Sequence, residues 1–475
     1  MERAIVEYLE REHGVRAPRE YYGRIDEWRA WWQGYYRPFH EFSECGAGGY
    51  PIKRELFRLN MAKKVCEDWA SLLLTEKTSI YAADTETSRF LSGDDGAHGF
   101  LESSSFMREA VRLTERAFAL GTGAAIVRLS GVNHDRGRLI PTPSAKITFD
   151  FVDASHIVPI TVRRGRITEA AFVSEIRRGG EDLIYIELHR MGEDGYVIEN
   201  ELCTLENGEL KRREGDGSVA GVVHTGSMIP LFSILTPNLS NHIDGRCGMG
   251  ISVFADAVDC LKGVDLAFNN FCRDIKLGGK KVFLNQSLIM RDEAGNRYTP
   301  DDVAQQLFVT IGDGDLAENT LISEHNPALR TDENADAVQH QLDYLSFRCG
   351  LGTRHYLFSG VQGKAQLTAT QYTGELQDMI QNTAKHRLNA EEFVRGAIRG
   401  VLWAAREILL LPVDPDCELT VTFDDGYFTD AETLRERDRL EVAAGLMLPY
   451  EYRMKWKGES EEIARARCAE AAEQN

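Results

Sequence analysis

The chain has 475 residues, of which 43% are hydrophobic and 27% are charged. That balance is ordinary for a folded protein, and the length exceeds what a single hydrophobic core usually supports, so about three modules are expected. The formal net charge of −19 is large, and an acidic surface repels a phosphate backbone. The composition therefore argues against a protein that wraps DNA tightly.

The nine cysteines are scattered and never adopt the C-x-x-C spacing of a zinc or redox site, so neither a metal centre nor a disulfide framework is predicted. Reduced thiols are expected. The N-terminal stretch MERAIVEYLEREHG is charged from its second residue and has no apolar core, so it is not expected to be a secretory signal. The uncharged stretch 217–243 is broken by prolines and polar residues, which favours strands and loops over a membrane span.

The first hundred residues are expected to be largely helical. Apolar residues near helical spacing predict one helix within 53–77, and another is expected from Phe106 to Leu120, ending at the glycines that follow. The stretch 24–39 is dense in aromatic side chains with little basic interleaving, which favours a core or a subunit contact over a platform for stacking bases. The members of this cluster are Trp28, Trp31, Trp32, Tyr35, Tyr36 and Phe39.

From 124 to about 235, short apolar runs alternate with turn residues, which predicts an antiparallel β region. The most regular helical pattern follows, from Phe254 to Leu277, and we expect Gly278 and Gly279 to end it in a left-handed cap. Its apolar seam repeats at spacings of three and four and consists of Phe254, Ala257, Leu261, Val264, Phe268, Phe271 and Ile275. Its polar face carries Asp259, Lys262, Asn269, Arg273 and Lys276.

An insert from Lys280 to Arg330 reads as a strand, a turn, a short helix and another strand. A second apolar seam then repeats the same spacing, with Thr331 as the expected N-cap and acidic residues in the first turn. The members of this second seam are Ala335, Val338, Leu342, Leu345 and Cys349. The predicted order is therefore helix, small α/β excursion, helix.

The stretch FSGVQGKAQLTATQYTGEL, which begins at Phe358, places two glycines and a lysine before a helix. These residues lie too close together for an ATP- or GTP-binding loop, and Ala365 follows the lysine where that loop needs Ser or Thr. Thr368 and Gln371 instead match a capping box, so a helix is expected from Thr368 to about Leu411, with an interruption near Asn389. A strand within 418–428 and two C-terminal helices complete the chain.

No catalytic constellation is evident, and neither an enzyme nor a cofactor is predicted. Asp424 and Asp425 are adjacent, so on a strand they would point to opposite faces, and together with Asp430 they fit a solvated turn better than an acid pair. Asp313 and Asp315 lie in GDGDLAEN, which lacks the remaining ligands of a calcium loop.

The order of these parts resembles the portal proteins of tailed bacteriophages, especially the long-tailed type. RLNMAKKVCEDWASLLLTEK looks like the N-terminal helix of that family, and HNPALRTDENADAVQHQLDYLSFRCGLG looks like its second stem helix. LTATQYTGELQDMIQNTAKH is similar to the segment that starts its long wing helix, with Gln371 where glutamate is commoner; either residue closes the capping box. VTFDDGYFTDAETL and AAGLMLPYEYRMKWKGESEEIA resemble its C-terminal part, so the resemblance runs from about Tyr50 to Ala471.

The resemblance implies an α+β portal fold with a helical stem, an α/β clip, a β-rich wing and a helical C-terminal crown, assembled as a ring of usually twelve copies. Such a ring sits in the virion at one capsid vertex, after assembly in the host cytoplasm, and double-stranded DNA passes through it without sequence preference. The implied partners are further copies of the chain, the terminase large subunit, the major capsid and scaffolding proteins and a head-to-tail adaptor. No membrane is implied.

The resemblance also divides the chain into parts. These are an N-terminal arm (1–55), a wing (56–245), a first stem helix (246–279), a clip (280–330), a second stem helix (331–351), a tunnel loop (352–367), a long wing helix (368–412) and a strand with crown helices (413–475). The implied channel residues of the stem are Lys262, Asn269, Arg273 and Lys276. The implied contacts of the loop with passing DNA are Phe358, Gly360, Val361, Gln362, Gly363, Lys364 and Gln366, with Thr368 and Gln371 anchoring the loop to the helix.

Two other functions stay open on the sequence alone. Another ring, such as a head-to-tail adaptor or a scaffold, would share the acidity and the helices but would be much shorter. A phosphate-binding enzyme would explain the loop at Lys364, and a nucleotide titration would distinguish it from a passive channel.

Overall fold

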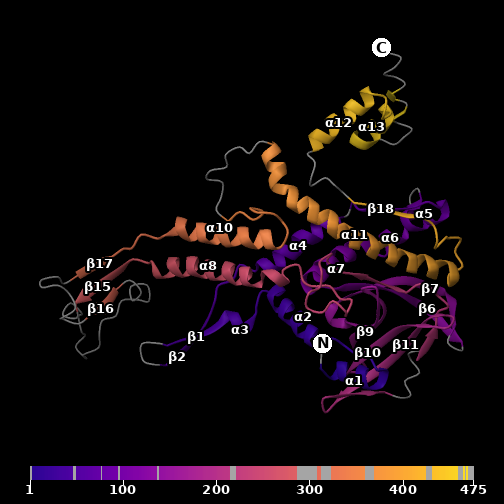
Figure 1. Cartoon of the computed structure of the whole chain (residues 1–475), viewed down its shortest axis with the longest axis horizontal. Coiled ribbons are helices and arrows are strands. Elements are labelled where there is room, and N and C mark those ends of the chain that lie inside the picture. The colour runs from indigo at the N-terminus through magenta and orange to yellow at the C-terminus, as the bar shows by residue number, and fades with distance from the viewer. Residues whose placement is uncertain are drawn as a thin grey trace.

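The computed structural model describes residues 3–45, 50–75, 77–94, 97–135, 138–213, 221–285, 308–311, 322–358, 369–423, 431–457, 464–465 and 467–468. Figure 1 shows an elongated molecule. A body of helices and strands lies at one end, and two long helices project from it side by side toward a small sheet.

The N-terminal part contains helices and one hairpin, and its aromatic cluster lies in the core, as expected. Trp28 and Trp31 are each 2% exposed, and Trp32 packs against the same core. The hairpin was not expected, because its second strand is fully exposed and carries charged residues where a strand usually carries apolar ones. The elements are α1 Arg3–His13, α2 Arg19–Trp32, α3 Arg37–His40, β1 Glu41–Cys45, β2 Pro51–Glu55 and α4 Met61–Leu73.

The next segment ends in the helix expected from Phe106 to Leu120, which is confirmed at both ends. Gly121 caps it with a φ of 86°, and a Cβ there would lie 2.3 Å from the Gly250 carbonyl oxygen, so both the backbone angle and the space require glycine. The elements are β3 Ser79–Ala82, α5 Thr85–Ser92, β4 Gly93–Asp94, β5 Ala97–His98, α6 Phe100–Ser103 and α7 Phe106–Leu120.

The strands from β6 to β14, called the wing here, confirm the antiparallel region expected from 124 to 235. One sheet has the strand order β14-β6-β7, and the other has the order β12-β11-β10-β9-β8 with β13 paired to β11. Neighbours in the second sheet are mostly consecutive in the chain, as in a meander of hairpins. The elements are β6 Gly123–Asp135, β7 Arg138–Asp153, η1 Ala154–His156, β8 Ile157–Arg163, β9 Arg166–Arg178, β10 Glu181–Gly192, β11 Gly195–Glu206, β12 Glu209–Arg212, β13 Val222–His224 and β14 Phe232–Leu235.

The projecting part consists of two helices and a three-stranded sheet. Its central strand pairs in parallel with the second strand and antiparallel with the third, so it contains one strand more than the sequence predicted. The short helix expected in this insert lies outside the described residues. The elements are η2 Ala255–Ala257, α8 Val258–Leu277, β15 Lys281–Asn285, β16 Phe308–Ile311, β17 Ile322–His325 and α10 Thr331–Arg348.

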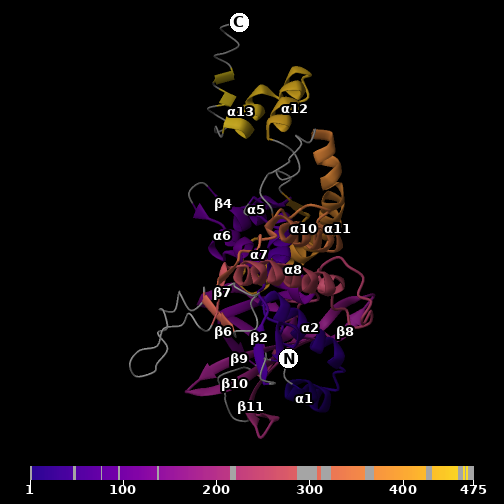
Figure 2. The same ribbon diagram turned by 90° about the vertical axis from the view of Figure 1, so that its left-hand side faces the viewer.

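The C-terminal part begins with α11, Ala369–Glu407, which confirms a long helix in the range expected, while its predicted first residue, Thr368, lies outside the described residues. The predicted interruption at Asn389 is wrong: the helix is continuous, and the Asn389 amide donates to the Thr236 carbonyl oxygen at 3.1 Å. The strand β18, Leu419–Thr422, pairs with the distant β3. Helices α12, Ala431–Ala443, and α13, Pro449–Lys457, follow, and Figure 2 shows them beyond the body on the side away from the wing strands.

Two hydrophobic clusters hold these elements together. The first joins the N-terminal helices and α4 to the larger wing sheet and to the body ends of α8 and α10, and it includes both Trp28 and Leu261. The second joins α7, the smaller wing sheet and α11, around Phe106 and Phe393. Because the first cluster continues into the stem, the projecting helices are packed onto the body at their base.

Candidate functional site

The two projecting helices, called the stem here, lie antiparallel along their whole length (Figure 1). At the end near the small sheet, Asp274 of α8 contacts Arg330 at the start of α10 at 3.2 Å. At the end near the body, Arg348 of α10 donates to the Asp256 carbonyl oxygen at 3.0 Å. The helix–insert–helix order predicted from the sequence is therefore a two-helix projection that carries a sheet at its tip.

The apolar seams meet as expected over the half of the stem near the body. Toward the tip the seam of α8 differs from the prediction, since Ile275 is 47% exposed. The seam residues that are buried in one common cluster are Phe254, Ala257, Leu261, Val264, Val338, Leu342, Leu345 and Cys349.

Three details of the helix ends differ from the prediction. The helix α8 begins at Val258, after the short η2, and not at Phe254. Gly278 has a φ of −75°, so it does not form a left-handed cap. A Cβ there would lie 2.3 Å from a methyl carbon of Leu329 and 2.7 Å from the Asp274 carbonyl oxygen, so a larger residue would require a local shift.

The N-terminus of α10 is capped from the neighbouring helix. Arg330 holds the N-cap position without a side-chain cap, so Thr331 is the first helical residue and not the cap. Asp274 supplies the acceptor: its carboxylate receives the Arg330 backbone N–H at 3.3 Å and the Asn334 amide at 3.0 Å. The side-chain hydrogen bond from the Arg330 guanidinium is the main cause that lowers the pKa of Asp274, and the two contacts above lower it further.

Three of the four predicted stem residues lie on the accessible surface of α8. Lys262 forms an ion pair with Asp259 at 2.9 Å, and Lys276 is exposed. Arg273 is exposed as well and pairs with Glu44 of the hairpin at 3.1 Å.

Asn269, the fourth, does not belong to that polar face. It is 9% exposed, and its side-chain oxygen accepts the Phe57 N–H at 3.2 Å. One turn earlier, Asp265 accepts the Leu59 N–H at 2.8 Å and contacts His40 Nε2 at 3.0 Å. Together these two side chains tie the N-terminal arm to the stem.

Sequence reasoning missed Asp265. The signal that could have found it is its place four residues before Asn269, on the same side of the helix as the apolar seam. A polar pair on the inner side of an amphipathic helix predicts buried hydrogen bonds to another segment.

Most of the predicted loop lies outside the described residues: Gly360, Val361, Gln362, Gly363, Lys364, Gln366 and Thr368. Gln371 lies in α11, but its side chain is also outside the described part, so the capping box stays a prediction.

Phe358 is the one predicted loop contact that lies among the described residues. Its ring lies edge-on to Phe268 at 6.2 Å and to Phe271 at 5.8 Å between ring centroids. A ring packed in this way fastens the chain to α8. The contact of Phe358 with DNA stays a prediction.

The segment 349–358, called the strap here, is held by side chains from several elements. Trp69 of α4 donates to the Cys349 carbonyl oxygen at 3.0 Å, and Asn382 of α11 donates to that of Gly350 at 3.0 Å. Ser346 donates to the Gly352 carbonyl oxygen at 2.5 Å. The strap thus links the stem to α4 and α11 of the body.

A buried ionic cluster joins the two wing sheets. Arg128 of β6 contacts both Asp150 and Glu187, and Glu187 Oε1 lies 2.7 Å from His189 Nε2. Burial opposes ionisation of Glu187, but His189 and Arg128 outweigh it and lower the pKa of Glu187 to about 2. Both Glu187 and His189 are at most 2% exposed, which fits a structural role and not a site that admits a substrate.

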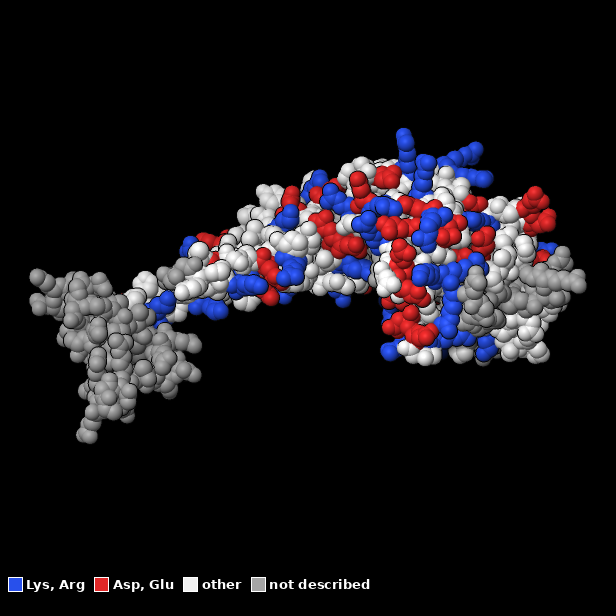
Figure 3. Space-filling model, turned by 90° about the horizontal axis from the view of Figure 1, so that it is seen from below, with Lys and Arg blue, Asp and Glu red and all other residues white. Residues whose placement is uncertain are grey.

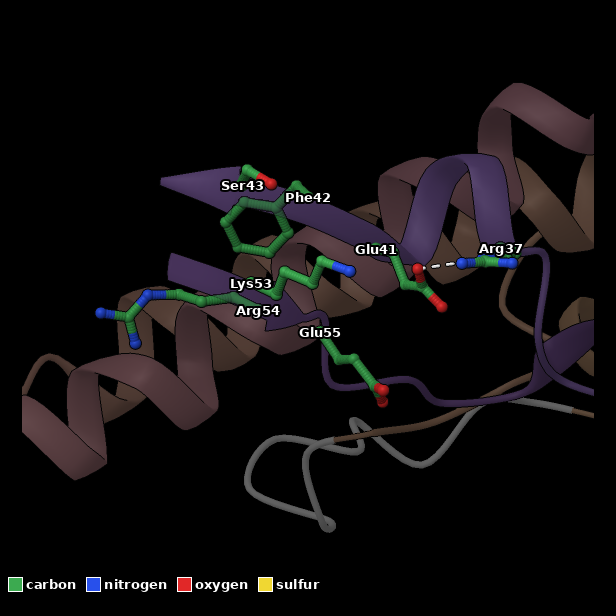
Figure 4. Close-up of a pocket in the computed structure, with 7 residues that line it drawn as sticks. All are labelled: Arg37, Glu41, Phe42, Ser43, Lys53, Arg54 and Glu55. Atoms are coloured by element: carbon green, nitrogen blue, oxygen red, sulfur yellow. Dashed lines mark hydrogen bonds and ion pairs between the residues drawn. The ribbon is translucent and has the colours of Figure 1, made fainter. Parts of the chain in front are cut away.

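The surface hollows carry opposite charges side by side. Figure 4 shows one of about 420 Å³ on the hairpin, where Arg37 bonds to Glu41 while Arg54 and Glu55 point apart. A second, of about 480 Å³, lies between the β8–β9 turn and α11, where Arg166 pairs with Glu392. In neither hollow do side chains converge in the manner of an acid–base pair or a nucleophile with its base.

Charges of both signs are interspersed over the part of the molecule visible in Figure 3, with no continuous basic surface on the described part of that face. Among the described residues, no group of His, Cys, Asp and Glu side chains is arranged to hold a metal ion. All nine cysteines lie in the described part and are free thiols. None of the described helices combines the length and apolar character needed to cross a bilayer.

Neither a scan against protein-family models nor a search of the curated proteins gives a match for this chain. What the chain shows is a mixed α and β fold with a helical stem, built from the residues described above.

Proposed function

We propose that this chain is the subunit of a portal-type ring through which double-stranded DNA enters and leaves a phage capsid. The observation that carries the proposal is the two-helix stem with a small sheet at its tip and a long helix behind it, which is the order of parts in that family. In this proposal α8 and α10 line the channel. The sheet β15–β17 is the clip that meets the terminase and later the tail adaptor, and the strands β6–β14 belong to the wing.

Large apolar side chains on the stem surface support assembly into a ring. Leu266 of α8 is 45% exposed, and Tyr344 and Phe347 of α10 are 61% and 57% exposed. A two-helix projection that leaves such side chains in water on both helices is suited to contact with a neighbour on each side. Contacts between two different surfaces, repeated around an axis, close into a cyclic oligomer.

The charge of the chain supports a passage and not a tight binding site. A formal net charge of −19 disfavours the release of counterions that holds a cationic protein on DNA. A wall that repels phosphates, with few lysines such as Lys262 and Lys276, lets DNA slide. Energy for transport would come from a separate ATPase, the terminase.

The test is negative-stain imaging of the purified chain together with native mass spectrometry. We expect closed rings with a central channel and a mass equal to a whole number of chains. If only monomers are found at micromolar concentration, the proposal fails. A titration with ATP addresses the enzyme alternative, since saturable nucleotide binding by the ring would favour it.

A further inference from the structure

Gln339 of α10 binds the backbone of the strap through both the nitrogen and the oxygen of its side-chain amide. Its Nε2 donates to the Tyr356 carbonyl oxygen at 2.7 Å, and its Oε1 accepts the Phe358 N–H at 2.8 Å. The backbone groups of residues two apart are thus paired by one side chain, much as a neighbouring β-strand would pair them.

The orientation of this amide is fixed by a third contact. Nε2 also donates to Asp343 Oδ1 at 2.9 Å, one turn further along α10. The carboxylate of Asp343 and the carbonyl oxygen of Tyr356 both need a donor, while the Phe358 N–H needs an acceptor. A flipped amide would place oxygen against two acceptors, so only one orientation satisfies all three groups.

The aromatic ring of Phe358 adds a contact with the other stem helix. It lies at 82° to the ring of Phe268 and at 89° to the ring of Phe271, which is the edge-to-face arrangement that aromatic pairs prefer. The two rings of α8 are three residues apart and share a face of the helix. Phe358 is therefore fastened to α10 through its backbone and to α8 through its side chain.

The strap residues that precede Phe358 are also held by contacts with their neighbours. Tyr356 is 9% exposed, and the carbonyl oxygens of Cys349, Gly350 and Gly352 each accept a hydrogen bond from a side chain. Phe358, the last residue of the described range 322–358, is thus held at one place along the stem.

We infer that Gln339 is a positioning residue that fixes the strap, as far as Phe358, at one height along the stem. The inference rests on the proposed function in one respect: in a ring, the same height is set in every subunit, so Phe358 would lie at one level of the channel in all of them. Gln339 acts through the backbone of the strap and does not itself touch DNA.

The first test measures how strongly Gln339 holds the backbone of Phe358, and its result does not depend on the proposed function. In Gln339→Met the side chain keeps its length but offers no N–H and no oxygen acceptor. Hydrogen exchange followed by mass spectrometry should show the amide of Phe358 exchanging at least about tenfold faster than in the wild type, because its hydrogen bond is lost. Gln341→Met is the matched control, since the Gln341 side chain lies against Gly263 on the same helix; its exchange should stay at the wild-type rate.

A second variant keeps the test decisive if Gln339→Met does not fold. Phe358→Leu leaves α10 untouched and removes only the aromatic contacts with α8. It should also raise exchange across 356–358, by a smaller factor than Gln339→Met. If the Phe358 amide exchanges at the wild-type rate in both variants, the inference that these contacts hold Phe358 on the stem is wrong.

The second test asks whether the anchor matters for DNA. Heads assembled with Gln339→Met in place of the wild-type chain should contain closed rings but retain shorter DNA, while Gln341→Met heads retain full-length DNA. Faster exchange at Phe358 combined with full-length DNA would overturn the positioning role. Failure of the proposed function would look different, since the wild-type chain itself would then form no ring, whereas the exchange result would still stand.

Discussion

Two ionisable side chains of the body are buried in opposite charge states. Glu187 is ionised, because His189 and Arg128 lower its pKa to about 2 against the opposing effect of burial. His386 is neutral, because burial and then Lys385 lower its pKa to about 3. Its ring packs between Trp69 and Phe118, so a proton there would be placed among aromatic side chains. Both residues make the stability of the fold depend on pH, over different ranges.

Replacing Glu187 should destabilise the wing strongly. In Glu187→Gln the guanidinium of Arg128 loses its buried partner, and removing one member of a buried ion pair costs about 3 kcal/mol. Because the folded-state pKa lies below the unfolded one, the stabilisation by Glu187 is fully present above about pH 4.5 and is lost as the pH falls toward 2. Urea unfolding at pH 7 and at pH 3 measures this. Equal differences between wild type and variant at both pH values would contradict it.

His386 should not titrate in the physiological range. NMR of the ring protons is expected to show no protonation of His386 between pH 5 and pH 8. A depressed folded-state pKa means that its contribution to stability is present above about pH 6.5 and is lost as the pH falls through about 3. A midpoint near 6.5 for His386 would show that the ring is accessible to water.

At the scale of the elements, the tip of the stem is fixed by contacts between helices and not by caps within each helix. Asp274 near the end of α8 receives the backbone N–H of Arg330 and the side-chain amide of Asn334, and a methyl carbon of Leu329 lies close to Gly278. The start of α10 therefore depends on α8. This dependence sets the register between the two helices at the end that carries the sheet β15–β17.

Asp274→Ala should loosen the first turn of α10. The Arg330 N–H and the Asn334 side-chain amide would lose their acceptor, so we expect hydrogen exchange across 330–334 to become several-fold faster while exchange near Leu345 stays unchanged. Asp259→Ala, which removes a carboxylate from the first turn of α8, is the control. If the two variants exchange alike at 330–334, the cap between the helices has no effect on the stem.

At the scale of the whole molecule, the exposed apolar residues of the stem and the acidity of the chain have to be considered together. Side chains such as Tyr344 and Phe347 favour contact with another copy, whereas the net charge of −19 opposes close approach of copies at low ionic strength. Ring formation should therefore become more complete as salt screens the repulsion, in contrast to a protein held on DNA by its own basic residues.

Reversing two stem charges tests the proposed channel. In the double variant Lys262→Glu and Lys276→Glu we expect rings to form as in the wild type. Packaging should slow by at least about twofold, because two transient phosphate contacts per subunit become repulsive. Arg399→Glu, which reverses an exposed charge on α11, should package normally. Unchanged packaging in the double variant would place these lysines against another subunit or in bulk solvent.

The sequence determined the features that depend on neighbouring residues. The end of α7 at Gly121, the start of α11 after Thr368 and the alternation of the wing strands follow from helical and strand periodicity and from the conformational freedom of glycine. The seam of the stem was readable for the same reason, because residues three and four apart share one face of a helix.

Only the tertiary structure decided which polar groups are buried and which distant segments pair. Asn269 was predicted to lie on the polar surface of the stem, but it is buried and accepts the Phe57 N–H, and the pairing of β3 with β18 joins segments far apart in the chain. Phe358 read as part of a loop, but the rings of α8 and the amide of Gln339 fasten it to the stem. Whether a residue is buried or exposed depends on which distant segment packs against it. The spacing of neighbouring residues does not predict that segment.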